Sequence, residues 1–234
     1  MTHWTNSEVE AAVGREIQAR TAQWVFGSQP VSWNGRRWRR SWTSYQMPAS
    51  APILDALDNE MQEHGLIRRS FVFGYAHSDP ANLIVAVMAW GAGDADNRGA
   101  WRAAMAIGGP VGDVLADVTS ALAQREDPAA DAFRAFFSKR SARLPRCNVS
   151  YATKILHFFA YESDVRPRPL IYDMRVANAL ARIPSAPFVP HHDSVVGGDQ
   201  YQRYCSWAED YAADKGTEPI VVEYALFAVG GQLR

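Results

Sequence analysis

Apolar residues recur every three to four positions along most of this chain, and this spacing restricts the fold more than any other feature of the sequence. A period of 3.6 residues is that of an α-helix with one buried face. The spacing predicts helices at residues 7–24, 54–64, 79–90, 111–124, 128–139, 150–161, 174–183, 200–214 and 219–229. We therefore expect a mainly all-α fold.

Glycine and proline mark where several of these helices begin and end. Gly65 follows the helix predicted at 54–64, and Asp79-Pro80 precedes the next one. The run Gly108-Gly109-Pro110 and the loop 184–198 are the expected hinges. We expect a single unit over residues 1–234, divided into possible lobes 1–109 and 110–234.

Residues 31–45 differ from the helical pattern. Asn34-Gly35 is a turn signal, and aromatic residues alternate with polar ones around it, which predicts a small β-hairpin. The same stretch interleaves tryptophans with four arginines, Arg36, Arg37, Arg39 and Arg40. Nucleic-acid-binding surfaces combine these residue types. A hairpin with one aromatic face and one solvated basic face explains the composition equally well.

Composition excludes several classes of protein. Of 234 residues, 47% are hydrophobic and 21% are charged, as in an ordinary globular protein. No apolar run reaches the ~18 residues of a membrane span, and the N-terminus lacks the basic and apolar regions of a signal peptide. Cys147 and Cys205 cannot by themselves form a zinc or iron–sulfur site. We expect a cytoplasmic protein with no cofactor and no metal, and a loop rather than a metal site at His191-His192-Asp193.

Charge is distributed unevenly along the chain. The formal net charge is −1, but residues 134–182 contain ten basic side chains against three acidic ones, a local excess of +7. A basic segment on a nearly neutral protein is typical of a surface that faces phosphates. A solvated helical face would give the same pattern.

Residues 144–180 contain the most informative combination of side chains. Lys154, His157 and Tyr161 share one face of a predicted helix. The segment Arg166-Pro-Arg-Pro169 must then be extended, because proline lacks an N–H donor and biases its predecessor away from α conformation. Asp173 stands directly before the next helix, where backbone N–H groups would hold its carboxylate ionised. Taken singly, Lys154 could be a lysine at a helix edge and Asp173 only a helix cap.

This segment resembles the helix-hairpin-helix and aspartate region of DNA glycosylases, specifically the 8-oxoguanine DNA glycosylase branch. The resemblance is carried by the Thr153-Lys154 pair, the 19-residue spacing to Asp173 and the Asp173-x-Arg175-Val176 run. It covers residues 130–230 and places the helix-hairpin-helix and aspartate segment at 144–183. It implies helical lobes around a cleft, with Lys154 as the nucleophile and Asp173 as its partner.

Further roles follow from the same resemblance. The stretch 222–227 is similar to the last helix of the family, which would place Phe227 against a flipped base and Glu223 at the base edge. Ser150 and Ala152 stand where the hairpin of the family has glycines. The resemblance implies that DNA is bound by Arg146, Ser150, Tyr151, Thr153 and Arg175, with Arg36, Arg37, Arg39 and Arg40 as further candidates.

The chemistry of base excision requires these residue types. A fixed carboxylate stabilises the positive charge that develops on the sugar, and a neutral amine can attack C1′ to form a Schiff base. A neighbouring cation such as His157 or Arg175 would favour the neutral amine. We therefore expect a DNA glycosylase with β-lyase activity, acting as a monomer on double-stranded DNA that contains a modified base or an abasic site, 8-oxoguanine-like in the first instance.

Three alternatives remain open. The base could be a bulky modified base of phage DNA, because Glu223 is acidic and the hairpin lacks its glycines; the protein would then serve in anti-phage defence. The chain could be a non-catalytic helix-hairpin-helix protein that binds DNA without releasing a base. It could also be an unrelated helical interaction protein, which would show no salt-dependent affinity for DNA.

Overall fold

The computed structural model describes residues 4–27, 29–47, 51–93, 98–124, 126–138, 141–187 and 196–233, and within these ranges the chain is mainly helical, as expected. The helices are α1 (Asn6–Gln18), α2 (Ala22–Gly27), α3 (Gly35–Ser44), α4 (Pro52–His64), α5 (Arg69–Phe73), α6 (Pro80–Ala92), α7 (Arg98–Ile107), α8 (Val111–Leu122), α9 (Pro128–Ala135), α10 (Val149–Ala160), α11 (Met174–Leu180), α12 (Gly198–Asp214) and α13 (Pro219–Gly230). Two short strands, β1 (Phe137–Ser138) and β2 (Ser141–Ala142), pair antiparallel between α9 and α10.

The β-hairpin predicted at residues 31–45 is wrong, because this stretch contains α3. The side chain of Asn34 accepts a hydrogen bond from the N–H of Arg37 (2.9 Å), so Asn34 caps a helix instead of forming a hairpin turn. Trp38 and Trp42 are four residues apart and both are buried, which gives the helix its core-facing side. Only Val31 pairs in strand fashion, with Ile67.

The observed helix ends agree with the predicted ones where the sequence contains a capping signal. Gly65 ends α4 in a left-handed conformation, with φ of 74°. Asp79 caps α6 through hydrogen bonds from the N–H groups of Ala81 and Asn82. The helix predicted at 7–24 is divided into α1 and α2, and the one predicted at 128–139 ends already at Ala135. Helices α5 and α7 were not predicted.

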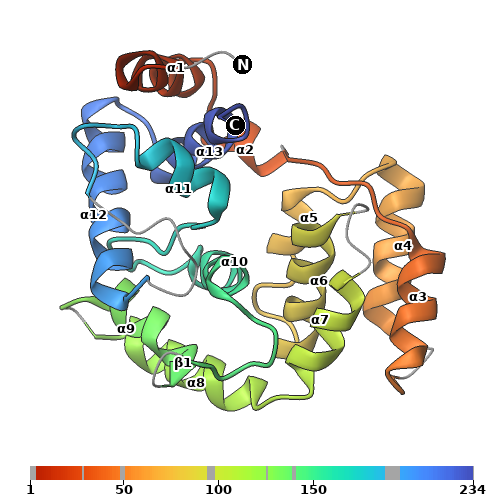
Figure 1. Cartoon of the computed structure of the whole chain (residues 1–234). Helices are drawn as coiled ribbons and strands as arrows, with labels where there is room; N and C mark the ends of the chain where they lie inside the picture. The colour runs from red at the N-terminus through yellow and green to blue at the C-terminus, as the bar shows by residue number, and fades with distance from the viewer. Residues whose placement is uncertain are drawn as a thin grey trace.

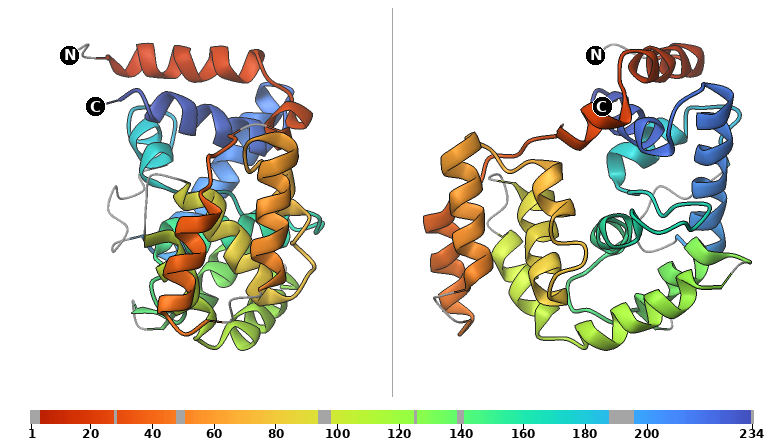
Figure 2. Two further views of the ribbon diagram at one scale, coloured as in Figure 1. Left: turned by 90° about the vertical axis from the view of Figure 1, so that its right-hand side faces the viewer. Right: turned by 180° about the vertical axis from the view of Figure 1, so that it is seen from behind.

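The helices form two lobes (Figures 1 and 2). The first lobe contains α3 to α7, and the second contains α8 to α13 together with α1 and α2, which pack against α13. The chain passes between the lobes after α2 and again between α7 and α8, around Gly108-Gly109-Pro110. Helix α10 lies at their junction and packs against α5 and α6 on one side and α9 on the other.

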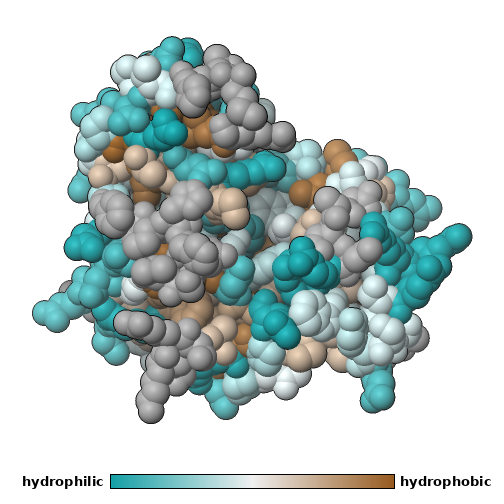
Figure 3. All heavy atoms as spheres, in the orientation of Figure 1, coloured by the Kyte–Doolittle hydropathy of each residue, from teal (hydrophilic) through white to brown (hydrophobic). Residues whose placement is uncertain are grey.

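Three helices are buried along most of their length. Every residue from Leu83 to Trp90 in α6 is buried, as are most residues of α10 and α13. In α10 the buried residues lie on every side of the helix and include Lys154 and His157. Hydrophilic residues dominate the face shown in Figure 3, whose outline is indented at the upper margin where the lobes meet. No helix among the described residues has the length and hydropathy of a membrane span.

Candidate active site

Lys154 and Asp173 meet at the junction of the lobes. The Lys154 Nζ lies 3.1 Å from Asp173 Oδ2 and 3.0 Å from Ser150 Oγ, one helical turn earlier in α10. The side chains of Lys154 and Asp173 are 7% and 14% exposed, so the ion pair is nearly enclosed. Gly91 of α6 faces it, and a Cβ at this glycine would lie 3.3 Å from Lys154 Cδ. The pair predicted from a 19-residue spacing is thus formed in space.

The segment that leads to Asp173 is fixed by side chains of two helices. Its consecutive carbonyl oxygens, from Pro169 to Ile171, accept hydrogen bonds from His157 Nδ1 (3.0 Å), Tyr201 Oη (2.7 Å) and Tyr204 Oη (3.1 Å). The N–H of Tyr172 donates to Thr153 Oγ1 (3.0 Å). Thr153 is adjacent to Lys154, and Tyr172 is adjacent to Asp173. This contact therefore sets the distance between the two charged side chains.

Asp173 is held as an anion. Burial alone would raise the pKa of Asp173, but the positive charge of Lys154 and hydrogen bonds from the N–H groups of Val176 and Arg175 lower it below its usual value. Asp173 Oδ1 accepts from Arg175 N at 3.0 Å and Val176 N at 3.2 Å, which makes Asp173 the N-cap of α11. The other carboxylate oxygen, Oδ2, accepts the hydrogen bond from Lys154 Nζ.

The turn before α10 differs from the expected hairpin. Asn148 caps α10 by accepting a hydrogen bond from the N–H of Tyr151, so Ser150 and Ala152 belong to the first turns of the helix and not to a loop. The helix predicted at 150–161 is thus confirmed at its start, one residue earlier than expected. The left-handed residue of the turn is Arg146, with φ of 62°.

Several arginines lie over aromatic rings near the ion pair. The guanidinium carbon of Arg175 lies 4.7 Å from the ring centroid of Phe227, and that of Arg146 lies 4.6 Å from that of Trp101. Arg102 donates to the hydroxyl of Tyr151. Arg146 and Arg175 are exposed, whereas Tyr151 is buried.

Thr153 is also buried, with its hydroxyl bound to backbone groups, so the expectation that it contacts DNA is wrong.

Glu223 has a buried cation as its partner. Its Oε2 accepts a hydrogen bond from Arg69 Nη2 at 2.5 Å, and neither side chain is exposed. The same Arg69 nitrogen lies 2.8 Å from His157 Nε2. The sequence did not predict a role for Arg69, because an arginine at the start of a five-residue helix is usually exposed to solvent.

His157 is not the cation that the sequence suggested. A guanidinium can only donate, so His157 Nε2 accepts from Arg69, and Nδ1 carries the proton that is donated to Pro169 O. Burial and the charge of Arg69 lower the pKa of His157 well below its usual range. The imidazole is therefore neutral.

Four of the ten basic side chains in segment 134–182 form ion pairs with carboxylates from outside the segment. The pairs are Arg134 with Asp131 and Asp199, Arg143 with Asp117, Arg166 with Glu209, and Arg168 with Glu218. In α3, Arg39 likewise binds Asp55 and Asp58, whereas Arg36, Arg37 and Arg40 are exposed. Arg146 and Arg175 make no ion pair with a described carboxylate and remain the strongest candidates for phosphate contacts.

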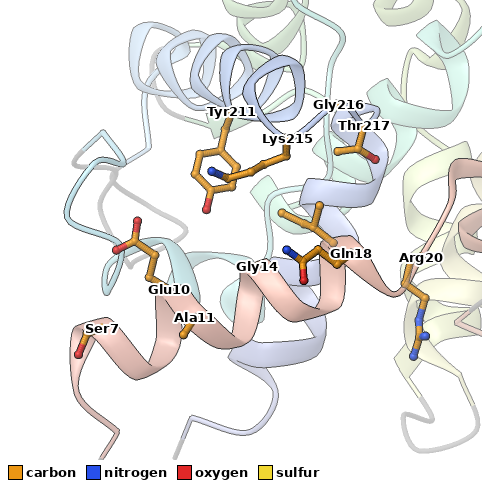
Figure 4. A pocket seen from close by; sticks show the side chains of 11 residues that line it. Ser7, Glu10, Ala11, Gly14, Gln18, Arg20, Tyr211, Lys215, Gly216 and Thr217 are labelled. Atoms are coloured by element: carbon orange, nitrogen blue, oxygen red, sulfur yellow. The ribbon is translucent and has the colours of Figure 1, made fainter.

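A pocket of about 650 Å³ lies apart from this ion pair, between α1 and the turn that joins α12 to α13 (Figure 4). Glu10, Gln18, Tyr211 and Lys215 contribute to its lining, but Lys154 and Asp173 do not. No group of three or more metal-ligating side chains occurs among the described residues. The run His191-His192-Asp193 lies outside those residues.

Comparison with known proteins agrees with this geometry. The family described as "Putative 8-oxoguanine DNA glycosylase OGG-like protein" matches residues 26–227, which include Lys154, Asp173, Glu223 and Phe227. Searches of curated proteins and of solved structures gave no match. Because the family match covers most of the chain and the fold is helical, this chain belongs to the 8-oxoguanine DNA glycosylase OGG-like family.

Proposed function

We propose that this protein is a DNA glycosylase with an associated β-lyase activity, which releases a damaged or modified base from double-stranded DNA. The observation that supports this most directly is the Lys154–Asp173 pair, 3.1 Å apart at a helix N-terminus. Family membership supports the glycosylase class. An 8-oxoguanine-type base is the first substrate to test.

The two side chains would divide the reaction between them. As the C1′–N bond breaks, its electron pair leaves with the base, and the Asp173 carboxylate stabilises the positive charge on the sugar. Lys154 Nζ loses a proton to the departing base and forms the new bond to C1′. A second proton moves from Nζ to O4′ as the sugar ring opens to the Schiff base, and water takes the C2′ proton as the 3′ phosphate leaves.

The other proposed contacts concern binding. Phe227 and Glu223 lie on α13, which packs against α11 and hence near Asp173, and we assign them to the wall of the base pocket. We assign phosphate contacts to Arg146 and Arg175, with Ser150 and Tyr151 beside Lys154. Arg36, Arg37 and Arg40 are on α3, at the outer edge of the first lobe (Figure 1), and would contact DNA only away from the lesion.

Borohydride trapping tests this proposal. The wild-type protein should form a covalent adduct on a duplex with an abasic site, because reduction captures the Schiff base. Lys154→Gln should lower adduct formation by about three orders of magnitude or more while DNA binding persists. Lys215→Gln, which changes an exposed lysine paired with Asp214, is the matched control and should trap normally.

The opposite result has a clear meaning. Tight binding without an adduct in the wild type would contradict the lyase chemistry and favour a protein that binds distorted DNA without cleaving it. An adduct that persists in Lys154→Gln would place the nucleophile elsewhere.

A further inference from the structure

A buried polar cluster lies beside the ion pair of the active site. It consists of Gln29, Arg69, His157 and Glu223, and we refer to it as the Arg69 cluster. Arg69 Nη1 donates to Gln29 Oε1 (2.8 Å), and Nη2 contacts both Glu223 Oε2 (2.5 Å) and His157 Nε2 (2.8 Å). One guanidinium from α5 of the first lobe thus holds side chains of α10 and α13.

Arg69 favours the charged form of Glu223 in a place where charge is unfavourable. Burial raises the pKa of Glu223 above its ordinary value, and the charge of Arg69 and the hydrogen bond from it limit this rise. A buried carboxylate without a partner would take up a proton rather than remain an anion. His157 is neutral, so Arg69 is the cation in direct contact with Glu223.

The cluster leaves specific atoms without a partner. Glu223 Oε1 and Gln29 Nε2 are buried, and neither makes a hydrogen bond with a described residue. Buried polar atoms are paired in the large majority of cases, so such atoms call for an explanation. Glu223 also interacts electrostatically with Asp173 and Lys154, which places its carboxylate near the proposed site of chemistry.

We infer that Arg69 is a positioning residue that determines base specificity, because it binds Glu223 Oε2 and leaves Oε1 as a charged acceptor for the edge of an extruded base. The inference rests on the proposed function. An anionic carboxylate can accept hydrogen bonds but cannot donate them. The preferred base therefore presents an N–H donor to Glu223, and a base with a ring nitrogen acceptor at that edge is disfavoured.

Arginine is required at this position because of its shape. Its planar fork reaches Gln29 through one nitrogen and both Glu223 and His157 through another. A lysine could offer its charge but not this geometry. Arg69→Lys should therefore retain part of the stability yet lose discrimination between bases.

The test measures single-turnover release of 8-oxoguanine and of 8-oxoadenine, which has a ring nitrogen acceptor where 8-oxoguanine has N1–H. Trapping on an abasic duplex is measured in parallel and reports the Lys154 chemistry without any base. In the wild type, 8-oxoguanine should be released at least about 10-fold faster. Arg69→Met and Glu223→Gln should each reduce that ratio about 10-fold, and should change release more than trapping.

Double substitution separates positioning from mere structural support. If Arg69 acts through Glu223, Arg69→Met/Glu223→Gln should show the same base ratio as either single variant, whereas independent effects would multiply. Arg68→Met is the matched control, since Arg68 is the preceding residue and pairs with Glu60 away from the cluster. Thermal unfolding identifies any variant that fails to fold, in which case Arg69→Lys takes its place.

Each outcome decides a different point. Equal loss of release for both bases and of trapping would mean that Arg69 only stabilises the fold, and would overturn the inference. Wild-type release of neither base, or faster release of 8-oxoadenine, would also overturn it, even with normal trapping. Absence of trapping by the wild type would instead contradict the proposed function.

Discussion

Asp173 has two roles that one substitution can separate. Its Oδ1 caps α11, and its Oδ2 faces Lys154. Asparagine caps helices about as well as aspartate but has no charge. In Asp173→Asn, base release should therefore fall at least about 100-fold, because the sugar cation loses its counter-charge, whereas the cap should lose no more than about 1 kcal/mol. Single-turnover release and urea unfolding measure the two effects. Asp79→Asn, at the cap of α6, is the control and should leave release unchanged.

The Asp173→Asn variant also tests how the stability of the fold depends on pH. The pKa of Asp173 is lower in the folded protein than in the unfolded chain, where a carboxyl has a pKa of about 3.9. Its contribution to stability is thus fully present above that value and is lost as the pH falls through the folded value. The difference in unfolding free energy between wild type and Asp173→Asn should shrink between pH 6 and pH 3. A constant difference would mean that the Lys154 contact does not stabilise the fold.

At the scale of elements, α10 positions the extended segment 169–172 through Thr153. Thr153→Val keeps the shape but leaves the N–H of Tyr172 buried without its acceptor, at a cost of about 1–3 kcal/mol. Because Tyr172 precedes Asp173, trapping should fall as well. Thr119→Val is the matched control, since Thr119 Oγ1 donates within α8, to Leu115 O. Equal trapping by both variants would show that Thr153 does not position Asp173.

Elements with explicit capping signals could be predicted from sequence, and the others show why prediction failed. Asp79-Pro80, Gly65 and Asp173 each mark a helix end by local chemistry. Asn34-Gly35 is ambiguous, because asparagine suits both a hairpin turn and a helix cap. Residues 35–44 form a helix because it buries Trp38 and Trp42 against neighbouring helices. These contacts are with residues distant in sequence, so local patterns do not reveal them. The Lys154–Asp173 pair was predictable, whereas Arg69 and Gln29 were not, since they join the site only through tertiary packing.

At the scale of the whole molecule, the charge that faces DNA is smaller than the sequence suggests. Four arginines of segment 134–182 bind carboxylates from outside the segment, whereas Arg146, Arg175 and Arg182 form no ion pair with a described carboxylate. Affinity for DNA should therefore decline gently with salt, with a log–log slope of about −2 to −4. Fluorescence anisotropy at several salt concentrations measures this slope.

Single substitutions show which arginines contact phosphates and so produce the salt dependence of DNA affinity. Arg146→Ala and Arg175→Ala should each make the log–log slope less steep by about 1. Arg143→Ala, which removes an arginine paired with Asp117, should not change it. A steep slope that survives both substitutions would direct attention to Arg36, Arg37 and Arg40 on α3.

The two lobes are joined by buried contacts as well as by the chain itself. The chain passes between them twice, and Arg69 of the first lobe is buried against α10 and α13 of the second. Spreading the lobes would separate Arg69 from Glu223 and leave each charge without its partner. Under the proposed function, we therefore expect bending of the DNA, at about 1–6 kcal/mol for 40–90°, to supply part of the work of bringing a base to Lys154. We then expect the stiffness of the flanking sequence to affect which lesions are released, even at base pairs that no side chain touches.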